Sequence, residues 1–81
     1  MTIKEYAEFL VKSIAKEPDM VSVQQFGGEE DATILEIIVH ESDMGAVIGR
    51  NGSMSSAIRT LIQARAHILG ENRVKINIDS F

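Results

Sequence analysis

Four consecutive residues, Gly49-Arg50-Asn51-Gly52, have the types and the spacing most suited to binding a ligand. The two glycines have no Cβ, so a ligand backbone can approach the main chain closely at both ends of the stretch, and Arg50 adds a positive charge between them. A helix that begins directly after Gly52 would point its free amide groups and the positive end of its dipole at the same place. This combination predicts a loop that holds the phosphates of a nucleic-acid backbone.

Two structural interpretations compete with this one. Asn51-Gly52 is a common type I′ hairpin turn, although neither flank alternates as a strand would. The stretch could also be a connector that only reverses the chain between two helices. Nucleotide loops are excluded more firmly, because Gly52 is followed by Ser53-Met54 instead of the Lys-Ser or Lys-Thr of a P-loop, and because the Gly-x-Gly-x-x-Gly spacing is absent.

The remaining polar residues show no pattern typical of catalysis or of metal binding. The chain has no cysteine, and His40 and His67 lack partners at ligand spacing, so we expect no metal site. The carboxylates gather in the first helix and in a glycine-rich loop, where solvent exposure explains them better than acid-base chemistry. Without a nucleophile, a base and an orienting group, the sequence predicts no enzyme, no catalytic residue and no cofactor.

The charge of the chain is unevenly distributed. Its 81 residues allow a single domain, residues 1–81, with a modest core. Residues 1–41 carry three bases against nine acids, a balance of −6, and residues 42–81 carry five bases against three acids, a balance of +2. Between Met44 and Gly70 there are three arginines and no acid. No apolar run is long enough to span a membrane and the N-terminus is charged, so we expect a soluble, cytoplasmic protein without membrane contact.

The apolar patterns predict three helices and three strands. Thr2 and Glu5 fit a capping box at the start of the first helix. Ser42 is expected to cap a short second helix with Asp43 in its first turn, where the dipole favours a negative charge, and Ser53 is expected to cap a long third helix. The predicted spans are 2–16, 42–48 and 53–69 for the helices and 21–26, 32–40 and 74–79 for the strands, with an acidic loop at 27–31.

These elements predict an α+β fold. The last strand returns through helices, so a right-handed crossover should make it parallel to the central second strand, whereas the first strand should be antiparallel. The result is a three-stranded mixed sheet with three helices packed on one face. In the long helix, the stripe expected to face the core is Met54, Ala57, Ile58, Leu61, Ile62, Ile68 and Leu69, with Ser55, Arg59, Gln63 and Ala66 largely opposite.

The loop and its surroundings resemble the core of the KH domain. In the segment ESDMGAVIGRNGSMSSAIRTLIQARA, the stretch from Ile48 to Gly52 stands in place of the KH pattern Ile-Gly-x-x-Gly, and the order α-β-β-α-α-β resembles the type II arrangement. From Tyr6 to Asp79 the chain is similar to the small bacterial single-KH proteins of the KhpA (YlqC) family. The likeness includes the residues Glu17-Pro18-Asp19, Asp43 to Gly45, and Ala57 to Thr60.

The resemblance implies a binding site for single-stranded RNA, because a KH loop clamps the backbone of about four nucleotides. Gly49 and Gly52 would permit backbone approach, and Arg50, Asn51 and Ser53 would meet phosphates. The other residues that the resemblance assigns to the site are Val47, Ile48 and Met54, which would shape a groove for the bases, and Ser56 and Arg59 on the following helix.

The resemblance also implies partners. These are a second copy of the chain, as a homodimer, and a larger KhpB/Jag (EloR)-type KH protein, as a heterodimer, in an RNA chaperone or post-transcriptional regulator linked to cell elongation and division. Family members often carry Lys or Arg where this chain has Ala46, Ser53 and Ser56, so we expect weak RNA affinity. The alternative is a KH-fold dimerisation module that has lost RNA binding, and an enzyme is the third class considered.

Overall fold

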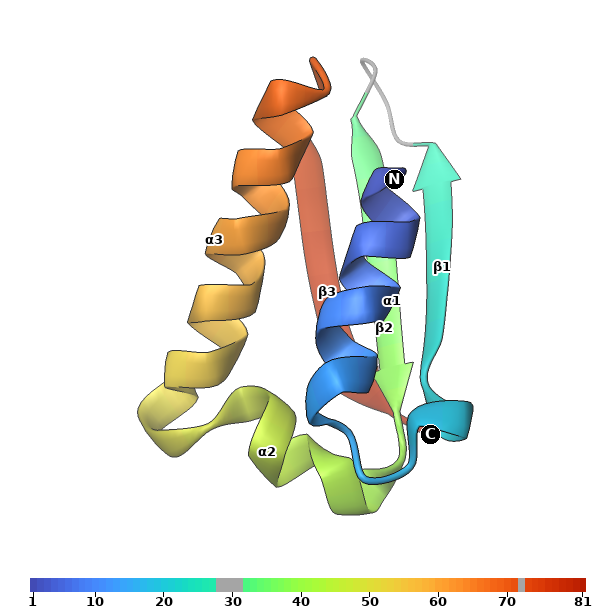
Figure 1. The fold of residues 1–81 in the computed structure, drawn as a ribbon, viewed down its shortest axis with the longest axis vertical. Coiled ribbons are helices and arrows are strands. Elements are labelled where there is room, and N and C mark those ends of the chain that lie inside the picture. The colour runs from blue at the N-terminus through green and yellow to red at the C-terminus, as the bar shows by residue number, and fades with distance from the viewer. Residues whose placement is uncertain (28–31, 72) are drawn as a thin grey trace.

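The computed structural model describes residues 1–27, 32–71 and 73–81, and its elements follow the order helix, strand, strand, helix, helix, strand (Figure 1). This confirms the predicted order, with boundaries that differ from the predicted ones by one or two residues. The predicted acidic loop lies almost entirely outside the described residues. The elements are α1 (Ile3–Ile14), β1 (Ser22–Gly27), β2 (Thr33–Val39), α2 (Met44–Ile48), α3 (Ser53–Ile68) and β3 (Val74–Ser80), with 3-10 turns at Pro18–Met20, Glu41–Asp43 and Arg50–Gly52.

The sheet has the predicted mixed topology. Its strand order is β1-β2-β3, with β1 antiparallel to β2 and β3 parallel to β2. The register sets Phe26 opposite Ile34, and Ile34 in turn beside Lys75. The most apolar strand, β2, is therefore central, and both other strands are edges, because a strand that is apolar on both faces fits between two neighbours.

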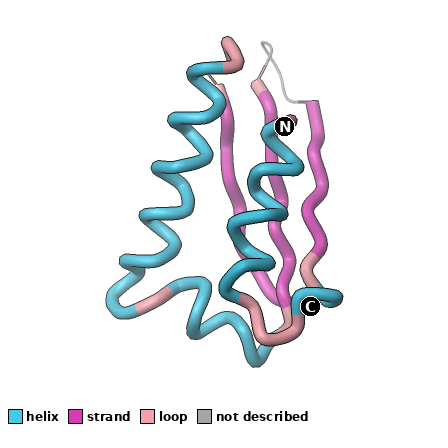
Figure 2. Tube along the Cα trace, in the orientation of Figure 1, coloured by secondary structure: helices cyan, strands magenta, loops and turns pink. Residues whose placement is uncertain are grey.

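The helices α1 and α3 lie side by side over one face of the sheet, and α2 lies where β2 leaves the sheet (Figures 1 and 2). The core between these layers comes from alternate residues of the strands and from one face of each helix. Its buried members are Ile3, Ala7, Val11, Val23, Leu35, Ile37, Val39, Val47, Ile58, Ile62, Ala66, Val74 and Ile76. This two-layer packing is the predicted α+β architecture.

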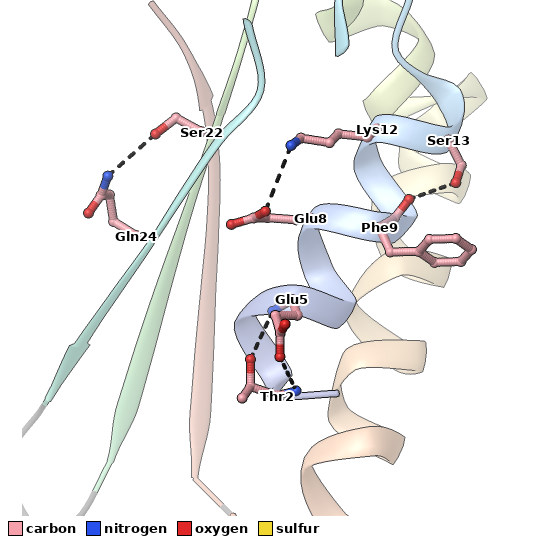
Figure 3. Close-up of polar contacts among 8 residues, drawn as sticks. All are labelled: Thr2, Glu5, Glu8, Phe9, Lys12, Ser13, Ser22 and Gln24. Atoms are coloured by element: carbon pink, nitrogen blue, oxygen red, sulfur yellow. Dashed lines mark hydrogen bonds and ion pairs between the residues drawn. The ribbon is translucent and has the colours of Figure 1, made fainter. Parts of the chain in front are cut away.

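The first helix begins at the predicted capping box (Figure 3). The Thr2 hydroxyl accepts a hydrogen bond from the Glu5 amide at 3.1 Å, and the Glu5 carboxylate accepts one from the Thr2 amide at 2.9 Å. The bond from the Thr2 amide is the main reason that the pKa of Glu5 is lowered. Two amides without partners inside the helix are satisfied in this way, which fixes where α1 starts.

The carboxylate of Asp43 joins the end of α1 to the start of α2. Asp43 is fully buried, and its two oxygens accept hydrogen bonds from the amides of Lys16 at 2.8 Å and Glu17 at 2.9 Å. These two bonds lower the pKa of Asp43. The prediction that Ser42 caps the second helix is wrong, because Asp43 occupies the N-cap position of α2 and no side chain caps it, while the Ser42 amide donates to His40 Nδ1 at 3.1 Å. The Asp43 side chain binds instead to the two amides that follow α1.

The face of α3 that meets the core differs from the predicted one. The buried residues are Ser55, Ile58, Ile62 and Ala66, two of which were expected on the outer side. Leu61 and Ile68 were expected in the core, yet they are 45% and 74% exposed. The helix has apolar residues on two sides, and the hydrophobic pattern alone does not show which side packs against the sheet. Where the helix lies close to the sheet, small residues such as Ser and Ala are buried with the large apolar ones.

Candidate nucleic-acid interface

The stretch Gly49-Arg50-Asn51-Gly52 connects two helices through three residues with positive φ. Gly49 (φ 75°, ψ 179°) ends α2, and its amide donates to the Gly45 carbonyl at 2.9 Å. Asn51 (φ 57°) and Gly52 (φ 77°) are both left-handed, a conformation that glycine adopts freely and asparagine tolerates better than most residues. The hairpin interpretation is therefore wrong, because both flanks are helical and no strand enters the turn.

The two glycines of the loop serve different purposes. A Cβ on Gly49 would lie 2.6 Å from the Met54 Cβ and 2.8 Å from the Met54 amide nitrogen, so glycine is needed there by the chain itself. A Cβ on Gly52 would meet nothing closer than the Ser55 hydroxyl at 3.9 Å. Open space for a ligand backbone is thus found at Gly52, whereas the space at Gly49 is already filled by the first turn of α3.

The first turn of α3 has no side-chain cap. Gly52 occupies the N-cap position, and Ser53, which was predicted as the cap, is the first residue inside the helix. The nearby hydroxyl of Ser55 donates to the Gly52 carbonyl at 3.1 Å, so it accepts nothing from the helix amides in the described hydrogen bonds. The amides of Gly52 and Ser53 donate to the carbonyls of Gly49 and Arg50, whereas no side chain caps the amides that follow in the first turn. These are left for solvent or for an anion, and the dipole of a 16-residue helix favours the anion.

The polar side chains at this end are exposed and available. Arg50 and Asn51 are exposed, and within the described chain neither makes a side-chain hydrogen bond or an ion pair. Arg59 is exposed on α3, on the same side of the helix as Ser56 and Gln63. Gln63 donates to the Val74 carbonyl at 2.7 Å, so this side of α3 borders β3.

The apolar residues predicted for a base-binding groove do not share one surface. Val47 is fully buried in the core, so no ligand can touch it, and its predicted contact with bases is wrong in this structure. Ile48 and Met54 are 39% and 38% exposed and remain accessible. At about 100° per residue, however, Met54 lies across the helix from Ser56 and well away from Arg59. The structure thus brings Ile48 and the first turn of α3 beside the loop, with Met54 close to Gly49 but turned away from the side of the helix that carries Ser56 and Arg59.

The chain matches a known family of protein domains over nearly its whole length. The family model described as "KhpA/KhpB, KH domain" matches residues 4–78, nearly the whole chain. The chain belongs to the KhpA/KhpB family of KH domains. The stretch Gly49-Arg50-Asn51-Gly52 thus lies between α2 and α3 of a KH domain, and the family is not one of enzymes.

Relatives of this KH domain include several proteins named "RNA-binding protein KhpA". The one from Clostridium perfringens is 44% identical over 64 residues, covering 79% of this chain and 84% of the relative. The one from Clostridium acetobutylicum is 41% identical over 76 residues, covering 94% of this chain and 99% of the relative. The family resemblance inferred from the sequence is confirmed.

Solved structures with the same fold include the protein Era. In Era bound to MgGDPNP and nucleotides 1506–1542 of 16S ribosomal RNA, the likeness has a TM-score of 0.68 at 20% identity and covers 98% of this chain. The KH domain described here spans 30% of that Era chain. At this identity the likeness concerns the fold alone.

Sequence reasoning missed two residues that position the site. Asp43 fixes the start of α2 against α1, and Gln63 fastens α3 to β3. The sequence signals a role for Asp43 only through its position just before an apolar segment, and this position alone suggests an interaction with the helix dipole. Across the described residues, no group of three His, Asp or Glu could hold a metal ion, and no helix is both long and apolar enough to cross a membrane.

Proposed function

We propose that this KH domain binds single-stranded RNA with the loop from Gly49 to Gly52 and the first turn of α3. The observation that carries the proposal is the uncapped N-terminus of α3 beside the exposed Arg50, in a stretch without acids. Phosphates would accept hydrogen bonds from the free amides and from Arg50, and the open side of Gly52 leaves room for their approach. The names of the KhpA relatives support the same ligand.

The other site residues then have distinct roles. Gly49 shapes the loop, Asn51 and Ser53 offer further polar groups to phosphates, and Ile48 forms an apolar wall for a base. Ser56 and Arg59 lie on the side of α3 toward β3, where the strand of RNA would continue. Because Ala46, Ser53 and Ser56 carry no charge, we expect few phosphate contacts and a shallow salt dependence, since each contact on a single strand contributes about −0.7 to the slope of log K against log salt.

Fluorescence anisotropy with a labelled single-stranded RNA of about ten nucleotides tests this proposal. Arg50→Asp should weaken binding and reduce the magnitude of the salt slope by about 0.7. Lys4→Asp, in the first turn of α1 and far in the fold from the loop between α2 and α3, makes the same change in net charge and should leave the slope unchanged (Figure 1). Equal slopes and affinities for Arg50→Asp and the wild type, with both folded, would remove the loop from the mechanism.

The exposed side of α3 supports a second function, dimerisation, which the chain could keep even without RNA binding. Five apolar residues on this side follow spacings of three and four and alternate large with small: Met54, Ala57, Leu61, Ala64 and Ile68. The pattern reads the same in both directions from Leu61, so two copies of α3 can pair in antiparallel fashion with large residues against large and small against small. The same surface could accept α3 of a KhpB/Jag-type KH protein as a heterodimer.

Sedimentation velocity across a range of concentrations tests the dimer. Leu61→Lys should yield a monomer, whereas Arg59→Lys, on another side of the helix, should still dimerise. A wild-type protein that stays monomeric at every concentration would reject the homodimer. Through the family we further propose action in the cytoplasm, as an RNA chaperone or post-transcriptional regulator linked to cell elongation and division, which RNA crosslinking with sequencing and co-purification of a KhpB/Jag-type partner would test.

A further inference from the structure

The face of the sheet turned away from α1 and α3 carries an ordered set of side chains that the KH loop does not use. In Figure 3, Ser22 and Gln24 lie on this open face, on the far side of the strands from α1. Because side chains alternate along a strand and the register is known, the open face holds Ser22, Gln24 and Phe26 of β1, Ile34, Glu36 and Ile38 of β2, and Lys75, Asn77 and Asp79 of β3.

One row of this face combines an aromatic ring, an aliphatic side chain and a cation. Phe26, Ile34 and Lys75 are direct neighbours across the three strands, which lie about 4.8 Å apart. Phe26 is 48% exposed, although nothing in the core requires a ring there. A hollow of about 370 Å³ opens beside the row, lined by Ala32, Ile34, Arg73, Val74 and Lys75. The apolar side chains of Phe26 and Ile34 thus lie next to two basic residues, Arg73 and Lys75.

The next row offers hydrogen-bonding groups. Gln24, Glu36 and Asn77 are neighbours in the register, two residues and therefore about 6.7 Å further along the strands. The two amides can donate or accept, and Glu36 accepts. The apolar row could take the flat face of a base, the polar row could bind the edge of the base, and the basic end could take the phosphate.

A second copy of the chain fits this face poorly. A twofold axis through its middle, whether along the strands or across them, would set Glu36 of one copy against Glu36 of the other. Two opposed carboxylates in a closing interface repel each other and lose their hydration. A ligand that brings hydrogen-bond donors to Glu36 and negative charge to Lys75 matches these two charged side chains, and Asp79 lies at the other end of the face.

We propose that the open face is a second contact for single-stranded RNA, separate from the KH loop. A base stacks on Phe26 and Ile34, its phosphate lies by Lys75, and Glu36 accepts hydrogen bonds from the base edge. Guanine presents adjacent imino and amino donors on that edge, whereas adenine presents one amino donor beside an acceptor, so guanine is preferred. Stacking on aromatic rings and reading of base edges are the usual means by which proteins hold single-stranded RNA.

The two contacts lie at opposite ends of the molecule. The row of Phe26 and Ile34 is near the start of β2, and the KH loop follows its end (Figure 1). The longest dimension of the domain is 35 Å, so one RNA strand reaches both contacts only by passing around the edge of the sheet. Short RNA therefore occupies each contact independently, and mutations in one should not change binding to the other.

NMR titration of the ¹⁵N-labelled protein with the tetranucleotides UGUU and UAUU separates the possibilities. We expect shifts at Gln24, Phe26, Glu36 and Lys75 that are larger for UGUU at equal concentration. If these amides shift while the loop amides stay still, this inference holds and the loop proposal fails. Shifts confined to the loop, or no shifts at all, would overturn the inference whatever becomes of the loop, and equal effects of both RNAs would overturn the assignment of Glu36.

Matched variants give a second readout. Phe26→Ala should weaken the shifts on the open face by about fivefold or more in apparent Kd, since stacking of one base contributes at least about that factor. Phe9→Ala removes an equally exposed ring from α1, where Phe9 is 58% exposed, and should have no effect. Both rings are at the surface, so both variants should remain folded, which circular dichroism would verify. Equal affinities for the two variants would contradict stacking on Phe26.

Discussion

Replacing Gly49 with alanine should destabilise the domain much more than the same change at Gly52. Gly49 has φ 75° and ψ 179°, a region that side chains avoid, at a cost of about 1–3 kcal/mol. The added Cβ would also lie 2.6 Å from the Met54 Cβ, closer than two carbon atoms can approach, and overpacking of this kind costs about 1–3 kcal/mol. The sum is about 2–6 kcal/mol, a large share of the free energy of unfolding of a small domain.

Gly52 lacks the second of these costs. Its left-handed conformation penalises alanine by about 1–2 kcal/mol. Alanine also restricts the backbone of the unfolded chain, and this offsets about 0.4–1 kcal/mol of the penalty. A Cβ there meets no atom within 3.4 Å, so the net loss should be between about 0 and 1.6 kcal/mol. The two variants make the same chemical change three residues apart, and each serves as the control for the other.

Urea denaturation followed by circular dichroism measures the difference. We expect similar m-values, a midpoint for Gly49→Ala well below that of Gly52→Ala, and a Tm for Gly49→Ala lower than the wild type by about 10 °C or more. If the two variants lose the same stability, then the first turn of α3 moves aside easily, and the conclusion that the fold itself requires glycine at position 49 is wrong.

Three further predictions follow from the described contacts. Gly52→Ala should stay folded yet weaken binding of single-stranded RNA in anisotropy titrations, and unchanged affinity would mean that no phosphate approaches that side of the loop. Asp43→Asn should lower the urea midpoint at pH 7, with the gap to the wild type closing as pH falls through the pKa of Asp43, because a carboxyl whose pKa is lowered by folding stabilises only while it is ionised; a gap that stays constant down to pH 3 would contradict this. Ile62→Ala, in the core, should cost about 2–5 kcal/mol in urea denaturation, whereas Leu61→Ala, 45% exposed, should cost far less in the monomer, and similar losses would contradict the assignment of faces on α3.

The sequence predicted the order of the elements and the pairing of the strands because both depend on strong, local signals. The capping box at Thr2 and Glu5 formed as expected, and the alternation in β3 marked an edge strand correctly. The crossover rule then determined which strands are parallel. None of these inferences required knowledge of contacts between distant side chains.

The details that failed all depend on such contacts. The burial of Ser55 and Ala66 depends on how closely α3 approaches the sheet, which favours small residues that a hydrophobic pattern ignores. The partner of Asp43 lies 26 and 27 residues away in the chain, at Glu17 and Lys16, beyond the reach of any local motif. The requirement for glycine at position 49 likewise became visible only with the position of Met54.

The short length of α2 has a consequence for the order of folding. Five residues form little more than one turn, and a helix of that length has no stability of its own in water. It forms only once α1 and the β1–β2 pair offer Asp43 its two amides and Val47 its place in the core. We therefore expect the loop from Gly49 to Gly52, which we propose binds RNA, to be assembled late in folding and to open early in native-state hydrogen exchange, while the amides of β2 exchange last.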